Sequence, residues 1–527
     1  MTRFPMLTAA AMLAAAWCCG AADLYRVAGV VVNADTGAPL PRAFVAVQRT
    51  GTTPVVASQT TGDDGRFAFD LPQGKYSLHS GTRAALEVYG KRTPDNLVGT
   101  SIITGPEQNT AGLVFRWFPP GGISGKIVDE AGEPVENALV QLVRSNVMAG
   151  QRVTSTFGWT RTDDRGEYRF GRLLASTYYL AVTARPWYSE APAFAPNTGA
   201  PSVAYAPVYY PNSLDKDGAA PLVLKSGEER RADFTLHTVA GATLKVTYDN
   251  PQGLSGLVGL ITEGIGDSDG YERQENLMPF GQTLQSVAPG HYMLRVKGTR
   301  GTASVTGTQR VEVTGTDLEV KVVPLPAPSV SGTIQLKNPG MKPRGTIAAS
   351  LVRLDTGAVV STAMRPDGAI SFPEVAPGKY RPVVRGTDSY FASEVHVEGA
   401  EIQDGVMELL EGTSAVLRMV ASDETGRVQG LVMRGEQAAE GMMVVLAPVS
   451  ENATAPPARG FQTDSDGSFD YQSVPAGDYF LFAVDESGIE YSKREVIRPY
   501  LGNAKRIKVE AHQSYSERIV VATVVRQ

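Results

Sequence analysis

The residues that most often carry hydrolytic chemistry stand apart from one another in this sequence. A zinc peptidase needs histidine and glutamate at ligand spacing, and a serine hydrolase needs a nucleophile turn such as G-x-S-x-G between a strand and a helix. The sequence has neither arrangement, and the histidines stand alone at His79, His237, His291, His396 and His512. We therefore expect no enzymatic activity, no catalytic residue and no cofactor.

Acidic turns are the second candidate for chemistry, because carboxylate oxygens bind calcium. No such turn is followed by the distal bidentate glutamate that completes a calcium loop. Aspartate beside glycine is also what a tight turn selects for its own geometry. We expect turns rather than a metal site at the acidic pairs, which are Asp63 with Asp64, Asp163 with Asp164, Asp267 with Asp269, and Asp464 with Asp466.

Aromatic side chains gather in one stretch, PWYSEAPAFAPNTGAPSVAYAPVYYPN, over residues 186–212. A long loop this rich in rings is unusual for a connection alone. Exposed rings could stack on the pyranose faces of a glycan. Alternatively, the rings fold back as a cap over the second unit or pack at its joint with the third. The candidate ligand-binding residues are Trp187, Tyr188, Phe194, Tyr205, Tyr209 and Tyr210.

A short sequence phrase is repeated along the chain and predicts the turns and strands that carry these residues. An Asp-Gly turn, an aromatic strand, a second glycine turn and a tyrosine-led strand return about once every hundred residues. Full copies begin at Thr61, Thr162, Arg365 and Thr463, and a half-copy begins at Leu284. Five units are expected, because the tyrosine of the phrase recurs at Tyr76, Tyr178, Tyr292, Tyr380 and Tyr479.

Each part of the phrase predicts a local structure. Asp-Gly predicts a tight hairpin, because glycine supplies a positive φ without a Cβ clash. A tyrosine at a strand entrance, with its ring buried and its hydroxyl turned back to the backbone, fixes the corner of a sandwich. Short strands separated by turns at regular spacing predict Greek-key sandwiches with almost no helix.

The expected fold class is all-β, with about five tandem seven-stranded Greek-key β-sandwiches in an elongated array. The third unit is divergent, since Pro279 and Phe280 stand where Asp-Gly would be. The sequence therefore does not predict its first hairpin. Proline-containing joints predict stiff, extended links between units. The expected division is a signal peptide at 1–22 and sandwiches at 23–118, 119–239 with the loop 186–212, 240–326, 327–411 and 412–527.

The phrase T-D-x-x-G-x-F-x-F followed by V-x-x-G-x-Y, with its opening G-x-V strand and G-x-P turn, resembles the carboxypeptidase regulatory-like domain. The resemblance covers four units well and the second half of the third. It implies a transthyretin-like sandwich, similar to collagen-adhesin B-type repeats and starch-binding-like sandwiches, outside the cytoplasm and without peptidase activity. Residues 205–236 also resemble a connection in exported acidobacterial proteins of this kind.

The N-terminus has the layout of a Sec signal peptide, with an apolar run from Met6 to Trp17 and small residues up to an expected cleavage after Ala22. Cys18 and Cys19 would leave with it, although a lipid anchor is a rival use of either. No later stretch approaches the roughly 20 apolar residues that span a bilayer. We expect a periplasmic or extracellular protein with no transmembrane segment.

The charges favour neither nucleic acid nor anionic lipid as a partner, because a net charge of −6 is spread without blocks. The fold resemblance favours a non-enzymatic exported binding protein or scaffold whose partner is a polysaccharide or other glycan. The alternative is a cell-envelope spacer or adhesion stalk that captures a protein partner by strand addition. A third hypothesis is an accessory to an outer-membrane receptor.

Overall fold

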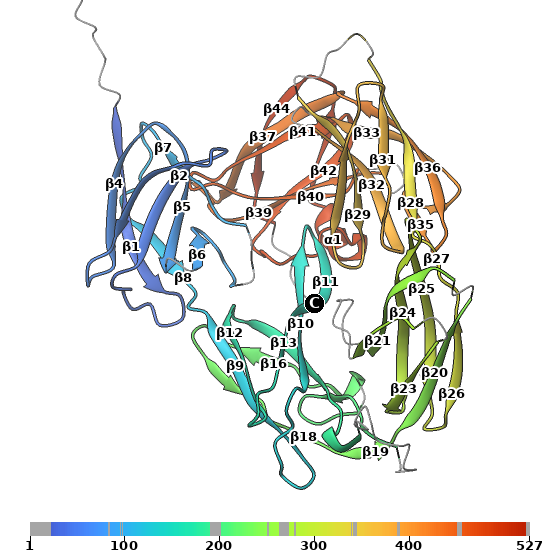
Figure 1. Cartoon of the computed structure of the whole chain (residues 1–527). Coiled ribbons are helices and arrows are strands. Elements are labelled where there is room, and N and C mark those ends of the chain that lie inside the picture. Colours follow the sequence, from blue (N-terminus) through green and yellow to red (C-terminus); the bar gives the residue numbers. More distant parts are fainter. Residues whose placement is uncertain are drawn as a thin grey trace, which may run out of the picture.

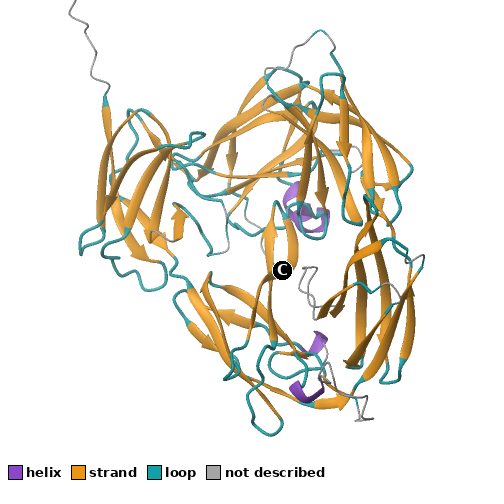
Figure 2. Cartoon of the chain, in the orientation of Figure 1, coloured by secondary structure: helices purple, strands orange, loops and turns teal. Residues whose placement is uncertain are grey.

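The chain is seen in a computed structural model (Figure 1) that describes residues 23–82, 85–94, 96, 98–189, 202–214, 216–249, 252–262, 273–278, 281–338, 340, 345–386, 390–450 and 456–522. Strands dominate this part of the chain, which contains one α-helix, α1 (Arg494–Leu501) (Figure 2). The all-β class is thus confirmed. Several predicted features lie outside the described residues: the expected leader with its two cysteines, Phe194, the Asp267–Asp269 turn, and the Pro279-Phe280 pair.

Every sandwich repeats one topology in two sheets. In the opening sheet, the first strand pairs antiparallel with the strand after the Asp-Gly position and parallel with the closing strand. In the tyrosine sheet, the second strand lies between the third strand and the tyrosine strand, antiparallel to both. The third unit keeps this topology as well, with strands Leu254–Thr262 and Arg273–Asn276 paired.

The first sandwich has an opening sheet of β1 (Leu24–Asn33), β4 (Arg66–Pro72) and β8 (Leu113–Trp117). Its tyrosine sheet contains β2 (Phe44–Arg49), β3 (Val55–Thr60), β5 (Gly74–Thr82), β6 (Ala85–Val88) and β7 (Ile102–Thr104).

The second sandwich has an opening sheet of β9 (Gly121–Asp129), β12 (Glu167–Leu173), β17 (Glu229–Arg231) and β18 (Phe234–Leu236). Its tyrosine sheet contains β10 (Leu139–Met148), β11 (Gln151–Arg161), β13 (Ser176–Thr183), β15 (Val208–Tyr209) and β16 (Leu222–Leu224). A ribbon of β14 (Val203–Tyr205) and β19 (Thr238–Ala240) leads to the third sandwich.

The third sandwich has an opening sheet of β20 (Ala242–Tyr248), β23 (Gln282–Val287) and β26 (Leu318–Val322). Its tyrosine sheet contains β21 (Leu254–Thr262), β22 (Arg273–Asn276), β24 (Gly290–Arg300), β25 (Ala303–Val313) and β27 (Leu325–Pro326).

The fourth sandwich has an opening sheet of β28 (Ser329–Leu336), β31 (Ala369–Phe372), β33 (Phe391–Glu398) and β36 (Ser414–Ser422). Its tyrosine sheet contains β29 (Ile347–Arg353), β30 (Val359–Ala363), β32 (Gly378–Gly386), β34 (Glu401–Gln403) and β35 (Val406–Leu409).

The fifth sandwich has an opening sheet of β37 (Thr425–Arg434), β38 (Gln437–Ala438), β41 (Ser468–Pro475) and β44 (Ser514–Val520). Its tyrosine sheet contains β39 (Met443–Pro448), β40 (Arg459–Gln462), β42 (Gly477–Val484) and β43 (Lys505–Val509), and α1 packs beside β42.

The Asp-Gly turns have the expected backbone conformation, but the two strands that each turn connects are not paired with each other. The glycines have positive φ, from 69° at Gly65 to 84° at Gly368, and the aspartates cap the turns: Asp64 Oδ1, for example, accepts the Arg66 N–H at 3.1 Å. The strands before and after each turn lie in opposite sheets, however. The expectation of a hairpin here is wrong, because each flanking strand finds its hydrogen-bond partner in a different sheet.

The tyrosine corner is confirmed in all five copies of the phrase. Each ring is buried, and each hydroxyl donates to a backbone carbonyl four residues upstream. The donor–acceptor distances are 3.0 Å for Tyr76, 2.8 Å for Tyr178, 2.9 Å for Tyr292, 2.7 Å for Tyr380 and 2.8 Å for Tyr479.

The buried side chains fall into one large cluster within each pair of sheets. From this pairing we infer a division into five units, with one change to the expected boundaries. Strand β36 pairs in parallel with β28 along its whole length, from Ser329 with Ser414 to Leu336 with Ala421. The fourth unit therefore continues past 411 to 422, because its opening sheet needs this closing strand.

The sandwiches do not form the elongated array that the joints suggested. Figure 1 shows them following a closed path, with the first sandwich beside the fifth. Hydrogen bonds join residues 90–103 of the first sandwich to residues 441–465 of the fifth. The expected extended linkers are overridden by side-chain contacts between units that are distant in sequence.

Candidate functional site

Two of the predicted aromatic residues are displayed on the surface. Trp187 and Tyr188 lie in a short 3-10 turn (Trp187–Ser189) that follows β13. The Trp187 side chain is 80% exposed, and Tyr188 is about half exposed. Their ring centroids are 5.6 Å apart with the planes almost perpendicular, at 85°. The pair therefore presents an open indole face with a second ring beside it.

Three others fold into the second sandwich instead. Tyr205 in β14 and Tyr209 in β15 are buried, and Tyr210 meets the buried ring of Phe234 edge-on at 6.0 Å. Desolvation raises the pKa of the Tyr205 hydroxyl, and the nearby Tyr188 hydroxyl raises it further. Burial of Tyr205 and Tyr209 agrees with the alternative in which the rings fold back onto the second unit, so these two residues do not belong to an exposed binding surface.

Sequence reasoning missed two exposed rings on the long strand β11. Trp159 is 59% exposed, and Phe157 is also exposed at a β-bulge in the pairing of β10 with β11. The Arg144 guanidinium lies over the Phe157 ring, 4.6 Å from its centroid. An available signal was the sequence TFGWT, where rings two residues apart must share one face of a strand unless a bulge intervenes. Among the described residues, the large exposed aromatic side chains all belong to the second sandwich.

An ion pair between a half-buried lysine and a buried aspartate closes the first sandwich onto the fifth. Lys75 Nζ lies 2.5 Å from Asp464 Oδ2, and the Asp464 side chain is only 5% exposed. Desolvation raises the pKa of Asp464 above its usual range, while the hydrogen bond and charge of Lys75 oppose that shift. A buried carboxylate of this kind is costly unless a cation stays beside it. The pair therefore fixes which part of the fifth sandwich faces the first.

Neutral hydrogen bonds surround that ion pair. Gln462 Nε2 donates to Gly90 O at 2.7 Å and to Thr100 Oγ1 at 2.9 Å. The Ser465 N–H donates to Ser101 O at 2.9 Å. These groups are largely buried, so separation of the two sandwiches would leave them without partners until water replaced them. The aspartate turn of the fifth sandwich is thus part of an interface rather than a free acidic loop.

A second long-range contact comes from the second sandwich. The hairpin β10–β11 ends at Gly150, whose carbonyl accepts the Ser492 N–H at 3.1 Å. Arg152 Nε lies 2.8 Å from Glu490 Oε1. A Cβ placed on Gly150 would be 2.4 Å from the Tyr491 ring, so only glycine allows this approach. The fifth sandwich is therefore contacted by both the first and the second.

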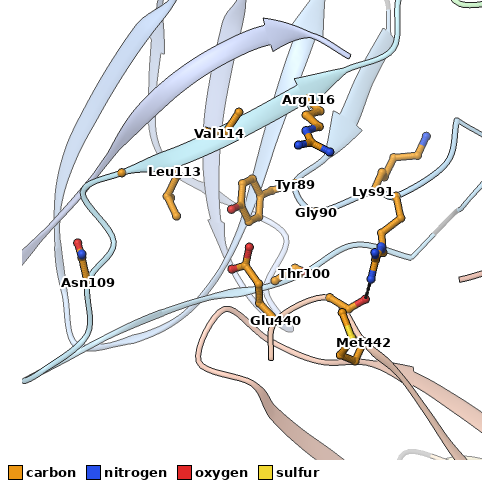
Figure 3. Close-up of a pocket in the computed structure, with 13 residues that line it drawn as sticks. Tyr89, Gly90, Lys91, Thr100, Asn109, Leu113, Val114, Arg116, Glu440 and Met442 are labelled. Atoms are coloured by element: carbon orange, nitrogen blue, oxygen red, sulfur yellow. Dashed lines mark hydrogen bonds between the residues drawn. The ribbon is translucent and has the colours of Figure 1, made fainter. Parts of the chain in front are cut away.

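A pocket of about 620 Å³ opens where the first and fifth sandwiches meet (Figure 3). Tyr89 and Arg116 line it from the first sandwich, and Glu440 and Met442 line it from the fifth. The Tyr89 ring packs against Phe115 at 5.9 Å. Because both sandwiches supply side chains, the pocket exists only while they are in contact.

The electrostatics of the pocket centre on Tyr89. Burial raises the pKa of the Tyr89 hydroxyl, and the nearby Glu440 carboxylate raises it further while Arg116 opposes the shift. Glu440 is an exposed residue, and its carboxyl group points toward Tyr89 in Figure 3. Desolvation there raises the pKa of Glu440, against the effect of Arg92. A phenol, a cation and an anion thus act on one another in this pocket.

Within the described ranges, no group of three or more histidine, cysteine, aspartate or glutamate residues could hold a metal ion. No helix in those ranges is both long and apolar enough to cross a bilayer.

Comparison with known proteins identifies one family and several remote structures. The family model of the carboxypeptidase regulatory-like domain matches residues 26–83 and 122–237. Those residues lie in the first and second sandwiches, so the resemblance seen in the sequence is confirmed for them. None of the curated proteins matches this chain.

Similar solved structures share little sequence with the chain. The Bacillus anthracis TIE protein is 13% identical over 76% of this chain and 75% of its own, with a TM-score of 0.17. The shaft pilin SpaA from Lactobacillus rhamnosus GG is 13% identical over 42% and 98%, with a TM-score of 0.19. GBS52, the minor pilin of Streptococcus agalactiae, is 13% identical over 41% and 96%, with a TM-score of 0.21.

Proposed function

With carboxypeptidase regulatory-like domains in its first two sandwiches, we propose that this chain is a non-enzymatic exported scaffold that presents a binding surface on a fixed frame. The leader-like N-terminus supports export. The absence of catalytic patterns in the sequence supports a binding role rather than turnover.

The observation that carries the scaffold proposal is the Lys75–Asp464 contact between the first and fifth sandwiches. Flexibly joined modules make few contacts outside their linkers. Here a buried charge pair and the hydrogen bonds of Gln462 hold the two ends of the array together. A frame closed in this way keeps a binding surface in one orientation relative to the other sandwiches.

The partner that we propose is a polysaccharide or other envelope glycan, bound at Trp187 and Tyr188. An exposed indole face attracts the axial C–H groups of a pyranose, while the sugar hydroxyls keep polar partners. The neighbouring Tyr188 ring stands almost perpendicular to it, so the two rings form a corner rather than a flat patch. Trp159 adds a further exposed ring on the same sandwich.

The test is binding of the mature chain to an array of bacterial envelope and storage polysaccharides. We expect Trp187→Ala to weaken glycan binding by about tenfold, or about 1.4 kcal/mol, because the change removes the most exposed ring of the proposed site. Leu214→Ala is the matched control, since Leu214 is an exposed apolar residue of the same sandwich. Unchanged glycan binding in Trp187→Ala, or no glycan binding by the parent, would reject this site.

The second candidate function is adhesion to a protein partner. Strand β30 is the outermost strand of its sheet and exposes Val359 and Val360, as an edge open to strand addition would. Two results together would favour this function. The first is no glycan binding on the array, and the second is capture of an envelope protein in a pull-down that Val360→Pro abolishes.

A further inference from the structure

The pocket between the first and fifth sandwiches contains two opposite charges without ion-pair partners. Four charged side chains line it, and two of them are already engaged: Lys91 pairs with Glu87, and Arg92 pairs with Asp485. The remaining two, Arg116 and Glu440, form no ion pair with any residue that the structure describes. Lone charges facing one small volume are expected to attract a ligand that carries the complementary charges.

The third polar group of the pocket is the Tyr89 hydroxyl. The ring is almost fully buried against Phe115, and the hydroxyl has no hydrogen-bond partner within the described ranges. Figure 3 shows Tyr89 between Arg116 and Glu440, and its hydroxyl interacts electrostatically with both. The three groups together offer two donor groups, the guanidinium and the phenol, and one carboxylate acceptor to a ligand.

This arrangement suits a sugar poorly. A pyranose needs the exposed face of a ring, and the Tyr89 ring is only 5% exposed. A ligand with only an anionic group would leave the partly desolvated Glu440 carboxylate without a cation, and one with only a cationic group would not use Arg116. A small molecule that carries both a carboxylate and an ammonium group satisfies the two charges at once.

We propose that this pocket binds a zwitterion of the α-amino acid class, with its carboxylate at Arg116 and its ammonium group at Glu440. The guanidinium fork matches a carboxylate in two parallel hydrogen bonds, and the Tyr89 hydroxyl donates to the same carboxylate. The volume of about 620 Å³ lies within the roughly 300–1,000 Å³ of small-molecule sites. This inference does not depend on the glycan site of the second sandwich.

Binding would also strengthen the closure of the frame. Arg116 belongs to the first sandwich and Glu440 to the fifth, so a ligand that bridges them binds only when the two are in contact. A ligand that prefers one state shifts the equilibrium toward it. The amide of Ser465, which donates across the same interface, should therefore exchange more slowly with ligand bound.

The experiment is isothermal titration of the full mature chain with the common L-amino acids, each tested singly. We expect at least one to bind, and we expect its N-acetyl and its amide derivatives to bind about tenfold more weakly or worse, because each lacks one charge. Arg116→Gln and Glu440→Gln should each weaken binding by a similar factor. Arg385→Gln and Glu374→Gln remove exposed charges of the fourth sandwich and should leave binding unchanged.

Three results would overturn the proposal. The first is that no free amino acid binds at millimolar concentration. The second is equal binding of the free amino acid and its capped derivatives. The third is binding that persists unchanged in both pocket variants, since the ligand would then occupy another site. Trp187→Ala should not affect this binding, which separates the outcome from that of the glycan experiment.

Discussion

The hairpins of the first two sandwiches occupy the same place in one topology but reach different distances. Strands β2 and β3 are six residues each, whereas β10 has 10 residues and β11 has 11. The longer hairpin extends about 13 Å further, at roughly 3.3 Å per residue. The short hairpin turns at Gly51, where no atom lies within 4 Å of an added Cβ. The long one turns at Gly150, against the Tyr491 ring.

The difference shows how a repeated module acquires a specific contact. Both hairpins keep the pairing with the tyrosine strand that defines the sandwich. Only the extension beyond that pairing carries Gly150 and Arg152 to the fifth sandwich. The shared phrase therefore encodes the module, and the hairpin length encodes which distant module it touches.

The two turn glycines should show the largest difference in stability between the two hairpins when each is replaced by alanine. Gly51→Ala should cost about 1–2 kcal/mol, since an L-residue is strained at its φ of 82°. Gly150→Ala should cost more, because its new Cβ must displace the Tyr491 ring in addition to adopting a φ of 75°. Hydrogen exchange of the Ser492 amide, which donates to Gly150, measures the opening of this contact. Equal protection of Ser492 in the two variants would mean that the hairpin tip contributes nothing to the frame.

Removal of the corner tyrosine hydroxyl should have a smaller effect on stability, and this effect should be equal in the two sandwiches. Tyr76→Phe and Tyr178→Phe each remove the hydroxyl that donates to a carbonyl four residues upstream. Each should cost about 1 kcal/mol of unfolding free energy, the value of a buried hydrogen bond. Urea denaturation followed by tryptophan fluorescence can compare the two. A loss in one sandwich without the other would show that the corner is not a common device.

The smallest effect is the pH dependence of the two long-range contacts. A hydrogen bond from Lys493, and then the Arg152 side chain, hold the pKa of Glu490 below its usual range. Glu490 therefore stabilises the fold above the unfolded pKa of about 4.3, and this contribution is lost as the pH falls through the folded pKa.

Asp464 should behave in the opposite sense. Desolvation raises its pKa in the folded state, so its charged form is penalised at neutral pH and the penalty is relieved as the pH falls through the folded pKa. Between pH 7 and pH 5, exchange of the Ser465 amide, corrected for intrinsic rate, should slow or stay constant, while that of Ser492 stays constant. Faster exchange at Ser465 over this range would contradict the sign.

The sequence was sufficient for features that depend on neighbours along the chain. The positive φ of Gly65 follows from its place after Asp64, and the Tyr76 hydroxyl reaches Pro72 only four residues away. The switch of sheets at the same turns could not be predicted locally, because it depends on which distant strand pairs with β4. Residues 405–412 resemble a closing strand in the sequence, so the fourth unit is predicted to end near 411. The true closing strand, β36, is identified only by its parallel pairing with β28.

The candidate sites divide in the same way. The aromatic content of residues 186–212 pointed to the second sandwich, but burial of Tyr205 and Tyr209 depends on the core into which they fold. The pocket at Tyr89 could not be predicted, because Glu440 reaches it only after the first and fifth sandwiches meet. The ion pair that brings them together joins residues 389 positions apart.

The Lys75–Asp464 contact has a consequence for the order in which the protein matures. Domains emerge and fold from the N-terminal end. The first sandwich, with Lys75, can therefore fold before Asp464, 389 residues later, is present. A chain that stopped before the fifth sandwich would leave the docking face of the first exposed to solvent, including the carbonyl of Gly90 and the hydroxyl of Thr100. Such a face is accessible to proteases and to incorrect partners. The first sandwich is therefore protected at this face only after the fifth sandwich has folded against it.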